Sequence, residues 1–203
     1  MFTKSLFEKL KSLALVYLGV LILGIVAAAL LRSYVVEFYQ VQSDAMVPSL
    51  FPGERVVVLH QFNREKLARG DVVVLHLAND PSREFVKRVV GLPADRVALQ
   101  QYRLSVNGKV ISGDPLSTGS LQFFTETFEQ KVFRVQWSDA STDFSVDVPK
   151  GHVFVLSDSR TTGQDSRQWG FVRLEQISGK VQYVVRAAEH ADAIRKTGWF
   201  LPL

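Results

Sequence analysis

Apolar side chains are distributed in two different ways along this chain. Residues 13–31 form a run of nineteen residues without a charged side chain. This is close to the roughly 20 residues that a helix needs to cross about 30 Å of hydrocarbon. Beyond residue 50, apolar positions occur in short β-branched runs separated by Gly, Pro and Asn. The first pattern predicts a transmembrane helix and the second predicts a β domain.

The flanking charges predict how this helix is oriented. Three lysines precede residues 13–31, and Arg32 follows them. Because positively charged flanks are retained in the cytoplasm, we expect residues 1–12 to be a cytoplasmic tail and residues 32–203 an extracytoplasmic domain. A cleaved secretory signal and a buried core helix are the alternatives. The run is longer than the roughly 7–15 apolar residues of a signal peptide, and no small-x-small cleavage site follows it.

The remaining chain is expected to fold as one mainly β, antiparallel domain. The expected strands are Arg55–Leu59, Asp71–Leu75, Phe85–Val90, Arg96–Leu99, Arg103–Val106, Lys109–Ile111, Leu121–Phe128, Val132–Trp137, Val153–Leu156 and Ile177–Val185. Asn107-Gly108 supplies the two positive φ angles of a type I′ turn, which predicts a β-hairpin. Residues 100–150 contain loop-forming clusters and are expected to be a variable insert, and Ala187–Lys196 is expected to form a short helix.

The composition excludes several kinds of function. The chain has no cysteine and four scattered histidines, so disulfides and Cys-ligated zinc cannot form, and we expect no metal or cofactor. The net charge of +4 is concentrated in the first 32 residues, which carry four cations and one anion. The nearly neutral remainder argues against binding to nucleic acid.

Residues 39–50 read Tyr-Gln-Val-Gln-Ser-Asp-Ala-Met-Val-Pro-Ser-Leu and are followed by a Gly-Glu pair. This stretch resembles the nucleophile box of type I signal peptidases, membrane-anchored serine proteases in which it reads roughly Ser-x-Ser-Met-x-Pro-Thr-Leu. Ser43 and Met46 fit the pattern, but Ala45 occupies the position of the nucleophilic serine. A methyl group has no oxygen that can attack a carbonyl.

A second box, Phe85–Val97, resembles the family segment in which a Lys-Arg pair precedes Gly-Leu-Pro-Gly-Asp. The resemblance implies that Lys87 is the general base. Lysine has a pKa of about 10.4, so accepting a proton near neutral pH requires burial, which lowers such a pKa by up to about 3–5 units. On this segment alone, a surface lysine on an edge strand is the alternative.

A third box, residues 157–172, is similar to the family's Gly-Asp-Asn-Arg…Asp-Ser-Arg-x-Trp-Gly. Its charged side chains are expected to pair and to hold the lysine strand against the nucleophile loop. These residues are Asp158, Arg160, Asp165 and Arg167. A solvated run of charges is the alternative. Some family members carry a serine at the position of Gly163 that hydrogen-bonds the catalytic lysine; Thr161, Thr162 and Ser166 are the candidates to replace it here.

The resemblance implies that the substrates are preproteins with N-terminal signal peptides, cut after Ala-x-Ala-like sites. The residues expected to form shallow pockets for these small side chains are Val41, Met46, Phe85 and Val86. In an active member, a serine at position 45 attacks the carbonyl and Lys87 takes its proton, while Ser43 and the backbone N–H of residue 45 bind the oxyanion. The implied location is the bacterial cytoplasmic membrane, in contact with lipid and with the secretion translocon.

Three hypotheses account for Ala45. In the first, the chain is a signal peptidase disabled at its nucleophile; we favour a laboratory Ser→Ala change, because a buried lysine without a role is costly to keep. In the second, it is a natural noncatalytic relative that acts as an assembly or chaperone factor for secreted proteins. The third is a self-cleaving repressor, which shares a Ser/Lys dyad and a related β fold but has a DNA-binding domain where this chain has its apolar segment.

Overall fold

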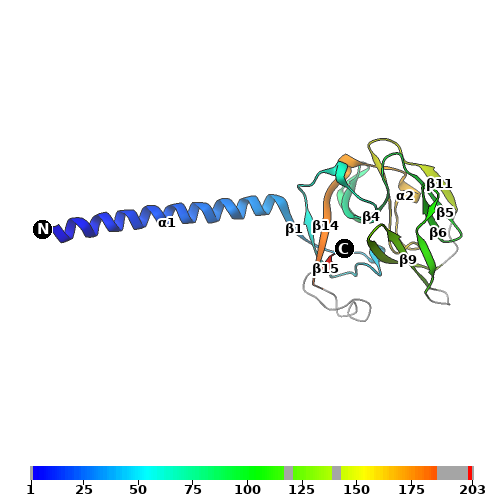
Figure 1. The fold of residues 1–203 in the computed structure, drawn as a ribbon, viewed down its shortest axis with the longest axis horizontal. Coiled ribbons are helices and arrows are strands. Elements are labelled where there is room, and N and C mark those ends of the chain that lie inside the picture. Colours follow the sequence, from blue (N-terminus) through cyan, green and yellow to red (C-terminus); the bar gives the residue numbers. More distant parts are fainter. Residues whose placement is uncertain (1, 117–120, 139–142, 187–200, 203) are drawn as a thin grey trace.

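The computed structural model describes residues 2–116, 121–138, 143–186 and 201–202. Helix α1 (Phe2–Val35) extends away from a β domain (Figure 1). Residues 13–31 lie within this helix, and apolar side chains such as Leu15 and Leu23 on it are exposed. Within the described residues, no helix is both long and apolar enough to cross a membrane.

The β domain contains three antiparallel sheets within the described residues. The largest has the strand order β1 (Val36–Gln40), β2 (Arg55–Leu59), β14 (Ile177–Arg186), β3 (Val72–Leu77), β4 (Asp80–Gly91), β12 (His152–Leu156) and β13 (Val172–Arg173), with β15 (Leu201–Pro202) paired to β14. The second has the order β10 (Lys131–Trp137), β9 (Gln122–Phe128) and β8 (Ser112–Pro115). The third has the order β11 (Phe144–Asp147), β5 (Arg96–Gln100), β6 (Arg103–Val106) and β7 (Lys109–Val110).

Four short helical segments connect these strands within the described part of the chain. They are η1 (Asp44–Met46), η2 (Arg64–Lys66), α2 (Ser166–Trp169) and η3 (Leu174–Gln176). Helix α2 forms because Asp165 caps it: the Asp165 carboxylate accepts from the N–H of Arg167, and the Gln168 side chain accepts from the N–H of Asp165. This capping box places Trp169 at the end of α2.

The prediction of a mainly β, antiparallel domain is confirmed. Asn107 and Gly108 both have positive φ, and they join β6 to β7 with Val106 opposite Lys109, as the hairpin prediction requires. The second hairpin strand ends at Val110, one residue before the predicted end. The expected helix Ala187–Lys196 lies outside the described residues.

Some elements were not predicted, and their sequences explain why. Strand β4 begins at Asp80, before the predicted Phe85, because polar residues pair with the end of β3. Strands β8 and β11 contain Ser, Gly, Asp or Pro, which carry a weak strand signal. They form because neighbouring strands provide partners: β9 for β8 and β5 for β11.

Three hydrophobic clusters fill the domain. One lies between β12 and the two smaller sheets, with Leu99, Val135 and Leu156 among its members. A second contains Val41, Met46 and Val86 and supports the loop that follows β1. A third contains Phe85, Val89 and Val155 on the other side of β4. Strand β4 contributes side chains to all three clusters, since Val90 of β4 belongs to the first.

A buried ion pair connects the second sheet to the segment that follows β12. Arg160 Nη2 donates to Glu126 Oε2 at 2.5 Å, and both side chains are fully buried. The Ser112 hydroxyl donates to the other oxygen of Glu126 at 3.2 Å. The neighbouring Ser159 N–H donates to the carbonyl of Ala45, so the pair also supports the loop that carries Ala45.

Glu126→Gln is expected to lower the free energy of unfolding by about 3–5 kcal/mol, because it leaves the Arg160 charge buried and uncompensated. Denaturant unfolding measures this loss. Asp114→Asn is the control, since its pair with Arg103 is exposed and should contribute less than about 1 kcal/mol. Equal losses for both variants would contradict the structural role of the buried pair.

Candidate active site

Ala45 lies in a loop that is closed by backbone hydrogen bonds. The N–H of Val41 donates to the carbonyl of Glu54 at 2.9 Å, and the N–H of Gly53 donates to the carbonyl of Val41 at 2.8 Å. Helix η1, which contains Ala45, contacts β4. The N–H of Ser159 donates to the carbonyl of Ala45 at 2.9 Å. Ala45 is therefore held between β4 and the segment that follows β12.

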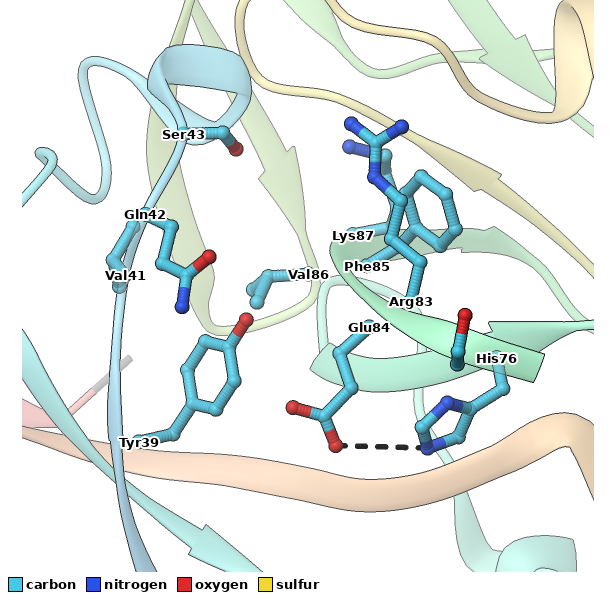
Figure 2. Close-up of a pocket in the computed structure, with 11 residues that line it drawn as sticks. Tyr39, Val41, Gln42, Ser43, His76, Arg83, Glu84, Phe85, Val86 and Lys87 are labelled. Carbon is cyan, nitrogen blue, oxygen red and sulfur yellow. Dashed lines mark ion pairs between the residues drawn. The ribbon is translucent and has the colours of Figure 1, made fainter. Parts of the chain in front are cut away.

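Ala45, at the position of the nucleophile, and Ser43, the expected oxyanion donor, have different surroundings. Ala45 is buried and ends in a methyl group, with a relative exposure of 8%. Ser43 is exposed and begins η1 without a hydrogen bond from its side chain to the helix. Its hydroxyl is therefore not used for capping, and Figure 2 shows it directed towards the pocket described below.

Lys87 lies on β4 opposite Val73 and is 97% buried, with 3% exposure. Its ammonium nitrogen lies 5.7 Å from the centre of the Trp169 ring. Burial lowers the pKa of Lys87 from 10.5 to about 8, while the Asp165 and Asp158 carboxylates oppose this shift. A lysine with this pKa is partly neutral near pH 8 and can accept a proton, as a general base must.

Arg88, the next residue on β4, binds the surrounding elements together. Its guanidinium donates to both carboxylate oxygens of Asp158, at 2.8 and 2.6 Å. It also donates to the Gly70 carbonyl at 2.8 Å and to the Ser49 hydroxyl at 3.0 Å. Because Ser49 belongs to the loop of Ala45, Arg88 fixes this loop relative to the strand that carries Lys87.

A cavity of about 550 Å³ lies beside Lys87, between the segment after β1 and strand β4 (Figure 2). Its lining residues are Tyr39, Val41, Gln42, Ser43, His76, Ser82, Arg83, Glu84, Phe85, Val86 and Lys87. Of the four predicted substrate-binding residues, Val41, Phe85 and Val86 line it. Met46 does not line the cavity but is buried in the hydrophobic cluster that also contains Val41 and Val86.

The end of the cavity remote from Ser43 is polar. His76 Nε2 lies 3.5 Å from Glu84 Oε1, as the dashed line in Figure 2 shows. Burial raises the pKa of Tyr39, and the nearby carboxylates of Glu84 and Glu37 raise it further. The cavity is thus apolar around Val41 and Val86 and ionisable at the other end.

The charged residues of the third box do not pair as a set. Asp165 and Arg167 pair with each other at 2.8 Å, as predicted. Asp158 pairs instead with Arg88, and Arg160 pairs with Glu126. All four side chains are thus paired, and Asp158 is paired with the strand that carries Lys87, but the partners Arg88 and Glu126 were not predicted.

The three candidate substitutes for a serine at position 163 are engaged elsewhere. The Thr161 hydroxyl accepts from the N–H of Ser138 at 2.8 Å, and the Ser166 hydroxyl accepts from the N–H of Val155 at 3.0 Å. The Thr162 hydroxyl lies 2.7 Å from the Ser159 hydroxyl. None of these contacts involves Lys87.

Sequence reasoning did not identify two residues that support the site, Ser49 through Arg88 and Glu126 through Arg160. Ser49 could have been found from the sequence, since it lies in the nucleophile box. No sequence pattern points to Glu126, because it lies in the insert and contacts the site only through Arg160. Within the described residues, no group of three or more His, Asp or Glu side chains is arranged to hold a metal ion.

Lys87→Met is expected to raise the free energy of unfolding at about pH 7 by about 3 kcal/mol, since each pKa unit corresponds to about 1.4 kcal/mol. The folded pKa of about 8 lies below the ordinary 10.5, so between these values the unfolded chain binds more protons and stability rises with pH. The gain from Lys87→Met should therefore be full below about pH 8 and disappear above about pH 10.5.

Unfolding by denaturant at several pH values measures this gain. Lys109→Met, at an exposed lysine of the β6–β7 hairpin, is the control and should give no such gain. A gain that is the same at all pH values would contradict the burial of a titrating ammonium at Lys87.

Comparison with known proteins finds relatives that match most of this chain. The signal peptidase I of Bacillus caldolyticus is 32% identical over 168 residues, covering 79% of this chain and 85% of the relative. Signal peptidase IB of Staphylococcus aureus strain Mu50 is 32% identical over 181 residues, covering 89% of each chain. A crystal structure of a signal peptidase I from Enterococcus faecalis V583 is 24% identical, with a TM-score of 0.41, and covers 57% of this chain and 96% of that one.

The family model described as signal peptidase, peptidase S26, matches residues 13–186. This range includes the loop of Ala45, strand β4 with Lys87 and the segment of Asp158 and Asp165. The chain belongs to the signal peptidase family, peptidase S26.

Proposed function

We propose that this chain is a signal peptidase that binds the signal-peptide ends of preproteins but does not cut them, because Ala45 lacks the attacking oxygen. The observation that carries this proposal is the burial and lowered pKa of Lys87 on β4, the strand that η1 with Ala45 contacts. A lysine that is partly neutral can take the proton of a nucleophilic hydroxyl. The resemblance to active members places such a hydroxyl at position 45.

The cavity supports binding of an extended peptide. The segment after β1 and strand β4 form its two sides, and a peptide lying between them can pair with backbone groups while its side chains alternate between the walls. Val41 and Val86 leave shallow apolar spaces, which suit alanine at the first and third positions before the cut. Preproteins ending in Ala-x-Ala are the proposed partners.

An active version of this site would work in the following way. A serine hydroxyl at position 45 attacks the carbonyl carbon, and neutral Lys87 takes the proton from that hydroxyl. The Ser43 hydroxyl and the N–H of residue 45 donate to the oxyanion that forms. Loss of the nucleophile from such a unit costs on the order of 10⁶ in rate. Ala45 is therefore proposed to remove catalysis while binding persists.

We also propose that residues 13–31 anchor the chain in the bacterial cytoplasmic membrane, with residues 1–12 in the cytoplasm. Support comes from the uncharged sequence and from the exposed apolar side chains of α1 in this range. An anchor of this kind would hold the cavity near the membrane and the secretion translocon, where preproteins emerge.

Protease added outside intact spheroplasts tests the orientation. We expect it to cleave within residues 60–200 and to leave the N-terminal tail protected, because the lysine-rich flank stays in the cytoplasm. Spheroplasts lysed with detergent are the control, in which both parts become accessible. Protection of residues 60–200 in intact spheroplasts would contradict the proposed topology.

Ala45→Ser is expected to restore cleavage of a preprotein after an Ala-x-Ala site, measured by gel shift and by mass spectrometry of the new N-terminus. The rate should rise with pH through an apparent pKa of about 8, because Lys87 must be neutral to accept the proton. Ala45→Gly supplies no oxygen and should remain inactive. Adding Ser43→Ala to Ala45→Ser should lower kcat by about 10²–10³, the effect of losing one oxyanion donor.

Adding Lys87→Met to Ala45→Ser should abolish the restored activity, since a serine hydroxyl needs a base near neutral pH. If folded, membrane-bound Ala45→Ser protein cleaves none of several preproteins, the enzyme proposal fails. The noncatalytic assembly or chaperone function then takes its place.

A further inference from the structure

The cavity continues past its apolar part along the face of β4 that carries Val86. Val86 lies opposite Val74 on β3, and Glu84 lies opposite His76. Opposite residues of an antiparallel pair share a face, and so do alternate residues of one strand. Val74 and Val86 belong to one hydrophobic cluster. Glu84 therefore follows that cluster on the same side of the sheet, with His76 beside it.

Glu84 presents a negative charge at this end of the cavity. Within the described part of the chain, its ion-pair partner is His76, with 3.5 Å between His76 Nε2 and Glu84 Oε1. His76 Nδ1 is buried and has no hydrogen-bond partner among these residues. A second hydrogen on the ring would be buried unpaired, so the neutral ring that donates from Nε2 is favoured. Such a ring orients the carboxylate without cancelling its charge.

The two cations of β4 that line the cavity lie on the other face of the strand. Arg83 and Lys87 alternate with Glu84, so both share the side of Phe85. The Arg83 guanidinium carbon lies 4.9 Å from the centre of the Phe85 ring, and Figure 2 shows it directed away from the Glu84 carboxylate. Neither cation therefore occupies the space in front of Glu84.

Strand β1 contributes Tyr39 to the same space. Figure 2 shows the Tyr39 ring and the Glu84 carboxylate on opposite sides of it. Burial raises the pKa of Tyr39, and the Glu84 and Glu37 carboxylates raise it further. The field of both carboxylates thus reaches this space, and the neutral Tyr39 hydroxyl can accept a hydrogen bond there. Tyr39, His76 and Glu84 together are called the acidic end of the cavity below.

The walls of the cavity determine which side chain of a bound preprotein reaches the acidic end. In the proposed function, alanines at the first and third positions before the cut lie against Val41 and Val86. Side chains of an extended peptide alternate, so the fifth position shares their side. Glu84 precedes Val86 by two residues, which is the same spacing of about 6.5 Å. The fifth residue before the cut therefore comes to the acidic end.

We propose that the acidic end binds a lysine or arginine side chain at the fifth position before the cut of a preprotein. The cation pairs with the Glu84 carboxylate and donates to the Tyr39 hydroxyl. This inference rests on the proposed function, since the Ala-x-Ala pockets place the peptide. The basic segment at the start of a signal peptide is too distant, because an apolar stretch of about 7–15 residues separates it from the cut region. The bound group is a basic residue between that stretch and the cut.

Equilibrium binding of three fluorescent peptides to the chain with Ala45 tests this proposal. The peptides contain an Ala-x-Ala site and carry Lys, Gln or Glu at the fifth position before the cut. The Lys peptide should bind about five- to tenfold more tightly than the Gln peptide, the effect of one partly exposed, charge-assisted pair. The Glu peptide should bind more weakly than the Gln peptide, because Glu84 repels it. The advantage of lysine should shrink at high salt, where such charges are screened.

A peptide with lysine at the fourth position controls for placement, because that side chain points to the opposite side of an extended peptide. It should bind no more tightly than the matching peptide with glutamine at the fourth position. A preference for lysine at the fourth position and not at the fifth would overturn the assignment.

Variants of the chain show whether Glu84 is responsible. Glu84→Gln should remove the difference between the Lys and Gln peptides. Glu37→Gln is the matched control and should keep most of that difference, since Glu37 is exposed, pairs with His60 at 2.6 Å and does not line the cavity. Glu84→Lys should reverse the order, so that the Glu peptide binds most tightly. A lysine preference that survives in folded Glu84→Gln or Glu84→Lys protein would overturn the proposal.

The outcomes separate this proposal from the proposed function. Equal binding of the Lys, Gln and Glu peptides would overturn the role of the acidic end while leaving the binding of Ala-x-Ala peptides in place. Binding of none of the peptides would contradict the proposed function, and this proposal would fall with it.

Discussion

The bidentate pair between Arg88 and Asp158 is the interaction on which the rest of the site depends. Both side chains are almost completely buried, and two further Arg88 N–H groups donate to the Gly70 carbonyl and the Ser49 hydroxyl. One guanidinium thus connects β4, the start of β3, the loop of Ala45 and the segment after β12. Removing either partner would leave a buried charge, so these elements can move only together. The position of Lys87 beside that loop follows from its place next to Arg88 on β4.

This framework explains how the Lys87 amine can be kept partly neutral in a chain that has alanine at position 45. Burial beside Trp169 lowers the Lys87 pKa to about 8, and the Asp165 and Asp158 carboxylates keep it from falling further. Each carboxylate is itself bound to an arginine, which limits its attraction for the ammonium. The free energy needed to bury the Lys87 amine therefore depends on residues that also hold the loops together. Replacement of one side chain at position 45 leaves all of these contacts in place.

Much of the fold could be predicted from local sequence, and much of the site could not. Asn107-Gly108 fixes its hairpin because the turn depends on two adjacent residues, and β2 has the bounds that its apolar run predicts. Lys87 was identifiable from its box, although its burial arises from β12 and α2, which lie far along the chain. The partners of Asp158 and Arg160 were missed because Arg88 and Glu126 approach them only in the folded domain.

The most direct measurement is equilibrium binding of a fluorescent preprotein-derived peptide ending in Ala-x-Ala to the chain with Ala45, with the peptide examined by mass spectrometry afterwards. We expect saturable binding and an intact peptide, because the cavity between Val41 and Val86 is present and the attacking oxygen is not. A peptide with Phe in place of the last alanine should not bind, since the proposed pockets accept only small side chains. Equal binding of both peptides, or binding of neither, would contradict the claim that this chain is a signal peptidase that retains its substrate site without its nucleophile.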